Sequence, residues 1–404
     1  MYLPVSKDRC TEVILYANEH GDEEAQSFFG LPLETITRYR RAFNAYEVST
    51  IDEIDDEGAL VRLEASKQKS TDVNRLLRKA NRESYRLYNT LETIYDEYIT
   101  TLKSSGFVDF TIKPHKVKYS GKQGILQISD THFNELIYPM ESNGNSYDFD
   151  IASRRLKKFV SEAIPIFKLY NIDQVLIAIT GDLINSDRRL SEKMASATSQ
   201  VRAALLATYL LQQVIIELSE HFSVSVASVA GNESRLGIDD FDSSDTLVSN
   251  NWDVMIYNNL RMLFEGKPIE FIDAINQVQQ VVTLDNGFNI LLIHGNYQKA
   301  PISDKSIGTI LQNYIYKGVP IHAVICGHIH SASIGDMVSR SSSLCGANAY
   351  STNDLMFISR ASQNLLIVNE DLGYHGIKLD LQNTDGYDGY NIIKELERYN
   401  VRSI

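Results

Sequence analysis

The pattern that most constrains the fold is a short apolar run, rich in Val, Ile and Leu, that ends abruptly in a polar side chain. Runs of this length between helix-like stretches predict buried strands of a largely parallel sheet. In open α/β folds, ligands bind at the carboxyl ends of such strands. We therefore expect the polar residues that follow the runs to meet at one edge. The runs span 125–129, 175–180, 224–230, 289–293 and 323–326.

The residues expected at this edge are all of metal-ligand types: Asp130, His132, Asp182, Asn232, His294, His328 and His330. Two carboxylates, an amide oxygen and four imidazoles, without a thiolate, suit manganese, iron or zinc better than calcium. One ion would not use so many ligands. Two divalent cations about 3.5–4 Å apart, sharing a bridging carboxylate and a bridging hydroxide, would use them all and would suit in-line attack at phosphorus. The set predicts a hydrolase with two divalent cations, Mn²⁺ first, with Fe, Zn and Mg as alternatives.

The order of these motifs resembles that of the calcineurin-like metallophosphoesterases over roughly residues 121–381. The matching motifs are Asp-x-His at 130–132, Gly-Asp at 181–182, Gly-Asn at 231–232, a later His294, and Gly-His-x-His at 327–330. The resemblance implies that one ion is held by Asp130, His132, Asp182 and His330. It implies that the other is held by Asp182, Asn232, His294 and His328, with Asp182 as the bridge. The fold implied is α/β, a two-sheet β-sandwich flanked by helices.

One motif departs from the family pattern, because Glu233 stands where the family has the histidine of Gly-Asn-His. In the family that histidine assists phosphate binding and protonates the leaving oxygen. A glutamate acts as an acid only if burial or nearby negative charge raises its pKa. Arg235 is the alternative phosphate contact, as a fixed cation. The substitution also leaves open a domain that has lost activity.

The substrate expectation follows from the branch that the motifs resemble. Gly-Asp-Leu-Ile-Asn-Ser at 181–186 differs from the protein-phosphatase motif, whereas Asp-Thr-His with Gly-Asp-Leu and an appended, partly basic helical region resembles the double-strand-break-repair exonuclease branch and phage-encoded phosphoesterases. We expect a DNA phosphodiesterase, such as an exonuclease. The alternatives are a phosphatase or nucleotide phosphodiesterase acting on a small substrate, and an inactive DNA-binding or assembly protein. Substrate contacts, or merely a polar turn, are expected at Asn348, Tyr350 and Asn353.

Residues 1–50 predict a small helical domain of the helix-turn-helix type. Helices are expected at 11–18, 23–29 and 33–43, with Gly30 in the tight turn and Ala25 as the small residue where helices pack. The last helix would contact DNA. Its candidate residues are Thr37, Arg38, Arg40 and Arg41. An ordinary helical hairpin for protein contact fits the same pattern.

The rest of the chain divides into three further parts. Residues 51–106 combine an acidic linker with a long helix whose apolar heptad seam runs from Val73 to Tyr98; the seam would form a homodimer or pack on its own catalytic domain. The catalytic domain spans 107–385, with a strand at 107–119, helices at 153–170 and 191–222, and a second sheet in 334–381. A tail with a helical stretch at 392–399 covers 386–404.

Net charge, apolar stretches and cysteine content indicate which partners and which cellular location to expect. The net charge of −13 argues against non-specific coating of nucleic acid or anionic membranes, although local basic patches can still bind phosphates. We expect no membrane segment, because no stretch of 18 or more apolar residues occurs and the start lacks a signal peptide's apolar core. The three cysteines, without Cys-x-x-Cys spacing, fit a reducing compartment. The expected location is the cytoplasm, or the host cytoplasm for a viral protein.

Overall fold

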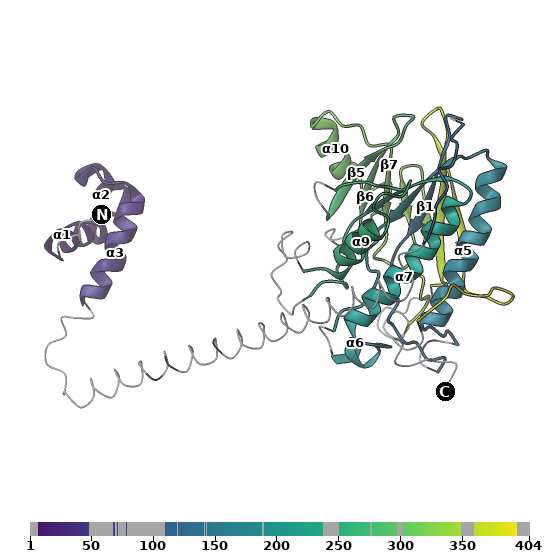
Figure 1. The fold of residues 1–404 in the computed structure, drawn as a ribbon. Helices are drawn as coiled ribbons and strands as arrows, with labels where there is room; N and C mark the ends of the chain where they lie inside the picture. The colour runs from purple at the N-terminus through teal and green to yellow at the C-terminus, as the bar shows by residue number, and fades with distance from the viewer. Residues whose placement is uncertain are drawn as a thin grey trace. The chain divides into compact units, whose positions relative to one another are not determined.

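The computed structural model describes residues 7–47, 68, 71, 78, 110–118, 120–140, 142, 144–187, 190–236, 250–274, 277–296, 302–348 and 359–393. The chain divides into two compact units, Met1–Thr93 and Ile94–Ile404, and each is considered by itself (Figure 1).

Residues 7–47 of the first unit form three helices: α1 (Lys7–His20), α2 (Asp22–Phe29) and α3 (Leu33–Glu47). They pack around a small apolar core of Val13, Ile14, Ala17, Ala25 and Ile36. Gly30 ends α2 with a φ of 63°, the left-handed conformation that glycine adopts without steric cost. These helices lie where the sequence predicts them. The heptad seam from Val73 to Tyr98 falls outside the described residues, apart from the isolated helical position Arg78, so self-association through it stays a prediction.

The first sheet of the second unit has the strand order β11-β10-β1-β2-β3-β4. Its strands are β1 (Gln123–Ile128), β2 (Gln174–Ile179), β3 (Ser223–Ser228), β4 (Glu270–Phe271), β10 (Ser362–Val368) and β11 (Tyr374–Asp380). Strands β1 to β4 run parallel, and β10 pairs antiparallel with both β1 and β11. The first three apolar runs of the sequence therefore lie side by side.

The second sheet has the order β5-β6-β7-β9-β8. Its strands are β5 (Gln279–Thr283), β6 (Asn289–Ile293), β7 (Ala323–Cys326), β8 (Ser333–Ile334) and β9 (Val338–Arg340). Strands β6, β7 and β9 are parallel, and the two edge strands are antiparallel. The expectation of one sheet for all five runs is wrong, because the last two runs form β6 and β7. The second sheet also starts before residue 334, and β10 and β11 join the first sheet instead.

The interior of the second unit lies between the two sheets. Ile125, Leu176 and Leu366 from the first sheet share one buried cluster with Ile290, Leu292 and Ile325 from the second. On the other face of the second sheet, Val324 and Cys326 pack with residues around α10 (Gly308–Tyr316). This is the two-sheet α/β architecture that the sequence predicts.

Helices α5 (Phe149–Leu169), α7 (Gln200–Ser219) and α9 (Trp252–Leu263) pack on one another beside the first sheet (Figure 1). Helix α5 buries Ala152, Leu156, Phe159, Ala163 and Phe167, whose spacing of three and four places them on one face. Among the described helices, α7 alone is long and apolar enough to cross a membrane, yet 67% of that stretch is buried within the protein. It is a core helix of this unit.

Three local expectations differ from the structure. Residues 110–118 form no strand; the Phe110 carbonyl instead accepts a hydrogen bond from Lys267, and the Lys118 amide donates to Asp173. The single helix expected at 191–222 is two, α6 (Leu190–Met194) and α7, since the intervening residues turn to pair with the loop after β1. Of the helix expected at 392–399, only Ile392 and Ile393 are described, and neither is helical; the rest of it lies outside the described residues.

A buried arginine joins α5 to the loop that precedes β10. Arg155 is 1% exposed, and its Nη1 donates to the carbonyls of Leu344 and Cys345 at 2.8 and 2.9 Å. Its Nη2 donates to Asn145 Oδ1 at 3.1 Å. The same loop donates the Leu344 amide to the Asp130 carbonyl at 3.0 Å. Arg155 thus stabilises the segment against which the Asp130 loop rests.

We expect Arg155→Met to lower the free energy of unfolding by about 3 kcal/mol, because it leaves two buried carbonyls without their charged donor. Urea denaturation followed by circular dichroism measures this change. Arg154→Met is the matched control: its pairing with Asp150 lies nearer the surface, and its loss should cost about 1 kcal/mol or less. Equal losses in the two variants would contradict this account of Arg155.

Candidate metal centre

The predicted ligand residues come together where the parallel strands of both sheets end. Asp130 and His132 follow β1, Asp182 follows β2 and Asn232 follows β3, all from the first sheet. His294 follows β6, and His328 and His330 follow β7, all from the second. The side chains form two groups, Asp130–His132–His330 and Asp182–His294–His328, in each of which the potential ligand atoms lie within 4.8 Å of one another.

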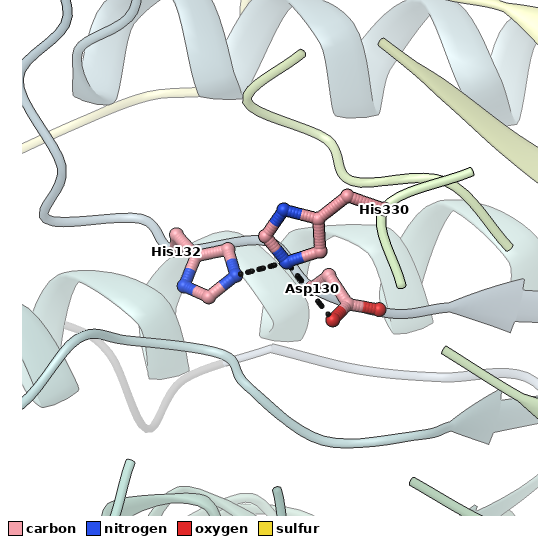
Figure 2. A group of neighbouring side chains, drawn as sticks. All are labelled: Asp130, His132 and His330. Atoms are coloured by element: carbon pink, nitrogen blue, oxygen red, sulfur yellow. Dashed lines mark hydrogen bonds and ion pairs between the residues drawn. The ribbon is translucent and has the colours of Figure 1, made fainter. Parts of the chain in front are cut away.

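The first group is shown in Figure 2. His330 Nε2 lies 3.1 Å from His132 Nε2 and 3.4 Å from Asp130 Oδ1, so three potential ligand atoms point at one place. The other ring nitrogen of His132, Nδ1, lies 2.5 Å from Asn185 Oδ1. Because a carbonyl oxygen only accepts, Nδ1 carries the proton and the Nε2 lone pair faces the group. This is how ligand histidines are normally oriented.

The second group has the same construction. His294 Nε2 lies 2.9 Å from Asp182 Oδ2 and 3.0 Å from Asn232 Oδ1, while its Nδ1 donates to the Thr180 carbonyl at 2.7 Å. The Asn232 amide nitrogen donates to Glu233, which turns the amide oxygen toward His294. The Glu233 backbone amide donates to Asp182 Oδ1 at 2.7 Å. Both oxygens of Asp182 are therefore held between neighbouring elements.

The site has an unusual backbone. Among the described residues, seven non-glycine residues have positive φ, and five of them belong to the two groups: Asp130, His132, Asp182, His328 and His330, with φ between 44° and 71°. Left-handed conformations of non-glycine residues cost roughly 1–3 kcal/mol each and persist only where surrounding contacts enforce them. In this site, hydrogen bonds to the backbone carbonyls enforce these conformations. The Asp130 carbonyl accepts from the Ser343 hydroxyl and the Leu344 amide, and the Thr131 carbonyl accepts from the Tyr147 hydroxyl.

Two motif glycines let the carboxylates approach the backbone. A Cβ on Gly231 would lie 2.1 Å from Asp182 Oδ1, and one on Gly327 would lie 2.1 Å from Asp130 Oδ2. Neither space can hold a methyl group unless the carboxylate moves. The glycines of Gly-Asn and Gly-His-x-His are thus required by the positions of Asp182 and Asp130.

The two groups pair opposite charges in a buried place. Burial alone would raise the pKa values of Asp130 and Asp182, but the facing histidines lower both below the usual range. Burial would lower the pKa of His294, yet the Asp182 carboxylate raises it to about 10. Burial also acts to lower the pKa of His330, but Asp130, Asp182 and Glu135 raise it. Burial and His294 lower the pKa of His328. A divalent cation would take the place of these protons.

Of the remaining predicted residues, some lie near the two groups and others fall outside the described residues. Glu233 contacts Asn232, and Arg235 forms a backbone bridge with Asn251. The Asn348 amide donates to Glu135 Oε1 at 2.8 Å, which places it near the His330 side of the site. Tyr350 and Asn353 lie outside the described residues.

The candidate DNA-contacting residues lie on α3 in the first unit. Thr37, Arg38 and Arg41 are exposed. Arg40 instead binds within the unit, donating to Asn18 at 2.6 Å and to Asp22 at 2.5 Å. Arg40 therefore joins α3 to α1 and α2.

Sequence reasoning missed three residues that hold the site. Asn185 orients His132, and Glu135 adds a negative charge beside His330. Asp253 accepts hydrogen bonds from the backbone amides of Asp182, in the loop after β2, and of Gly231, in the loop after β3. The spacing Asn251-Trp252-Asp253 is a helix-start signal, and Asn251 does cap α9. Nothing in that signal points to a loop nearly seventy residues earlier.

Comparisons with known proteins add little to this geometry. No family model matches the chain, and no curated protein matches it. Among solved structures, it is similar to wild-type Vps29 complexed with Zn²⁺ from Entamoeba histolytica, at 13% identity, covering 64% of this chain and 99% of that one, with a TM-score of 0.28. A likeness this distant carries no inference about function.

We expect Gly231→Ala to weaken the binding of divalent cations by roughly 10-fold or more, because the added methyl group displaces Asp182. Isothermal titration of Mn²⁺ into the purified variant measures the effect. Gly308→Ala is the control, since a Cβ there meets nothing within 4 Å. Wild-type affinity in Gly231→Ala would show that the Asp182 carboxylate does not bind the metal from this position.

Proposed function

We propose that this chain is a metal-dependent phosphoesterase whose site holds two divalent cations. The observation that carries the proposal is the meeting of two Asp–His–His groups at the strand ends of both sheets. The donor set fits such ions, since carboxylates and neutral imidazoles suit Mn²⁺, Fe or Zn²⁺. The Nε2 atoms of His132 and His294 face the groups because their Nδ1 atoms are already engaged.

The proposed ligands divide between the two ions with Asp182 shared. Asp130, His132 and His330 would complete the first site, and Asn232, His294 and His328 the second. Bound divalent cations supply Lewis-acid activation of a phosphoester and of the attacking water. The chain's own residues orient these ligands: Asn185 holds His132, the Thr180 carbonyl holds His294, and Glu233 holds Asn232. Proton donation by Glu233 and phosphate contact by Arg235 stay predictions.

Charge around the site favours a diester over a monoester. Glu135 and Glu233 add negative charge beside the two groups, and Asn348 fixes the Glu135 carboxylate. A phosphomonoester dianion carries one more negative charge than a diester, and like charges at close range cost free energy. We therefore favour phosphodiesterase activity over phosphatase activity.

The test uses bis-p-nitrophenyl phosphate and p-nitrophenyl phosphate with added Mn²⁺. We expect the wild-type protein to hydrolyse the diester faster, and Asp182→Asn to lose about 100-fold or more of that activity together with bound metal. Asp173→Asn is the matched control, because Asp173 lies just before β2 and Asp182 lies just after it. Full turnover with two metals retained in Asp182→Asn would reject the site. A wild-type protein inactive on both esters would indicate the alternative, an inactive binding protein.

We further propose that the diester is DNA, delivered by the first unit. The support is its three-helix arrangement, with Arg38 and Arg41 exposed on α3. In this view the first unit is dispensable for hydrolysis of a small diester and needed for tight DNA binding. A nucleotide or another small diester is the alternative substrate.

We expect Arg38→Ala with Arg41→Ala to weaken DNA binding and to reduce its salt dependence by about one unit of log–log slope per lost phosphate contact. Fluorescence anisotropy with a labelled duplex at several salt concentrations measures both quantities. Arg40→Ala is the control, because Arg40 binds Asn18 and Asp22 and its loss should alter stability instead. Unchanged affinity and slope in the double variant would exclude α3 as the reading helix.

A further inference from the structure

Asp253 is a fully buried carboxylate in the first turn of α9 that accepts four hydrogen bonds. Its Oδ2 accepts from the backbone amides of Asp182 and Gly231 at 2.9 and 2.8 Å. Its Oδ1 accepts from the Leu183 amide at 2.9 Å and from the Ser234 hydroxyl at 2.6 Å. Both carboxylate oxygens are engaged by these donors, and Asp253 belongs to neither Asp–His–His group.

The four donors come from two loops only. Asp182 and Leu183 belong to the loop after β2, and Gly231 and Ser234 belong to the loop after β3. A single oxygen, Oδ2, joins one amide from each loop, and it therefore helps to set how far apart the loops lie, together with the direct bond from the Glu233 amide to Asp182 Oδ1. Asn251 adds to the same connection, because its amide donates to the Gly231 carbonyl at 2.9 Å.

The other half of the site is bonded to the Asp182 loop, since the His132 amide donates to the Asp182 carbonyl at 3.1 Å, but it also has supports of its own. The loop with Asp130 and His132 is held by Ser343, Leu344 and Tyr147, which belong to other parts of the chain. None of the four donors to Asp253 comes from that loop or from the loop of His330. A change at Asp253 should therefore reach the two proposed cations unequally.

A carboxylate at this position costs free energy, because it is buried and lies near Asp182, another negative group. An asparagine has the same shape but only one accepting atom, so its NH₂ group would face two donors. The positive end of the α9 helix dipole also favours a negative charge here. The four donors and the helix end account for retaining an aspartate.

We infer that Asp253 is a positioning residue that sets the spacing of Asp182 and Asn232. It therefore governs the binding of the second cation, which takes both side chains, more than that of the first, which takes Asp182 alone. This inference rests on the proposed two-cation centre.

The test is a Mn²⁺ titration of full-length Asp253→Asn followed by electron paramagnetic resonance. For the wild-type protein, we expect two equivalents to produce a spin-coupled pair. For the variant, the second Mn²⁺ should bind roughly 10-fold to 100-fold more weakly and the first should lose clearly less affinity, so that a mononuclear signal remains at two equivalents. This readout needs no substrate.

Two controls separate positioning from general loss of structure. Asp148→Asn changes another fully buried aspartate at a helix start, where it caps α5 through the Ile151 amide, and should leave both Mn²⁺ affinities unchanged. Ser234→Ala removes one of the four donors and should weaken the second Mn²⁺ more than the first, by less than Asp253→Asn does. If Asp253→Asn does not fold by circular dichroism, Ser234→Ala carries the test.

The outcomes are distinct. Equal weakening of both cations, or a spin-coupled pair unchanged from the wild type, overturns the role of Asp253 while leaving the two-cation phosphoesterase in place. A wild-type protein that binds only one Mn²⁺ overturns the two-cation centre and this inference with it.

Discussion

The site depends on contacts that cross from one sheet to the other. Asp182 of the first sheet meets His294 of the second, and Asp130 of the first meets His330 of the second. These contacts form only if the sheets pack with their strand ends aligned. Buried polar groups beneath the site support that alignment: Gln127 of β1 donates to the Cys326 carbonyl of β7 at 2.7 Å and accepts from Ser339 of β9. The apolar cluster between the sheets and the metal groups therefore depend on one packing arrangement.

This packing arrangement also includes features that are unfavourable in free energy. Left-handed backbone, buried carboxylates and close glycine contacts are concentrated at five residues and their neighbours. Each is unfavourable alone, and the surrounding hydrogen bonds hold them in place. The aspartates face histidines, and the Asp130 and Asp182 carboxylates raise the pKa values of His330 and His294.

The two halves of the site are supported by different parts of the chain. The Asp130 half rests on the segment before β10, which Arg155 ties to α5. The Asp182 half rests on the start of α9 through Asp253. Two acidic groups, Glu135 and Glu233, lie at the margin of the centre.

The sequence by itself determined the five apolar strands, the ligand types that follow them, the helices at 153–170 and in the first unit, and the two-sheet α/β class. It did so because apolar periodicity and turn signals are local. Only the tertiary structure decided that β6 and β7 belong to the second sheet and that β10 joins the first, since a buried apolar strand does not specify its neighbour. The same limit hid Asp253: most of its partners are backbone amides, which nearly every residue has, and only folding decides which of them face one carboxylate.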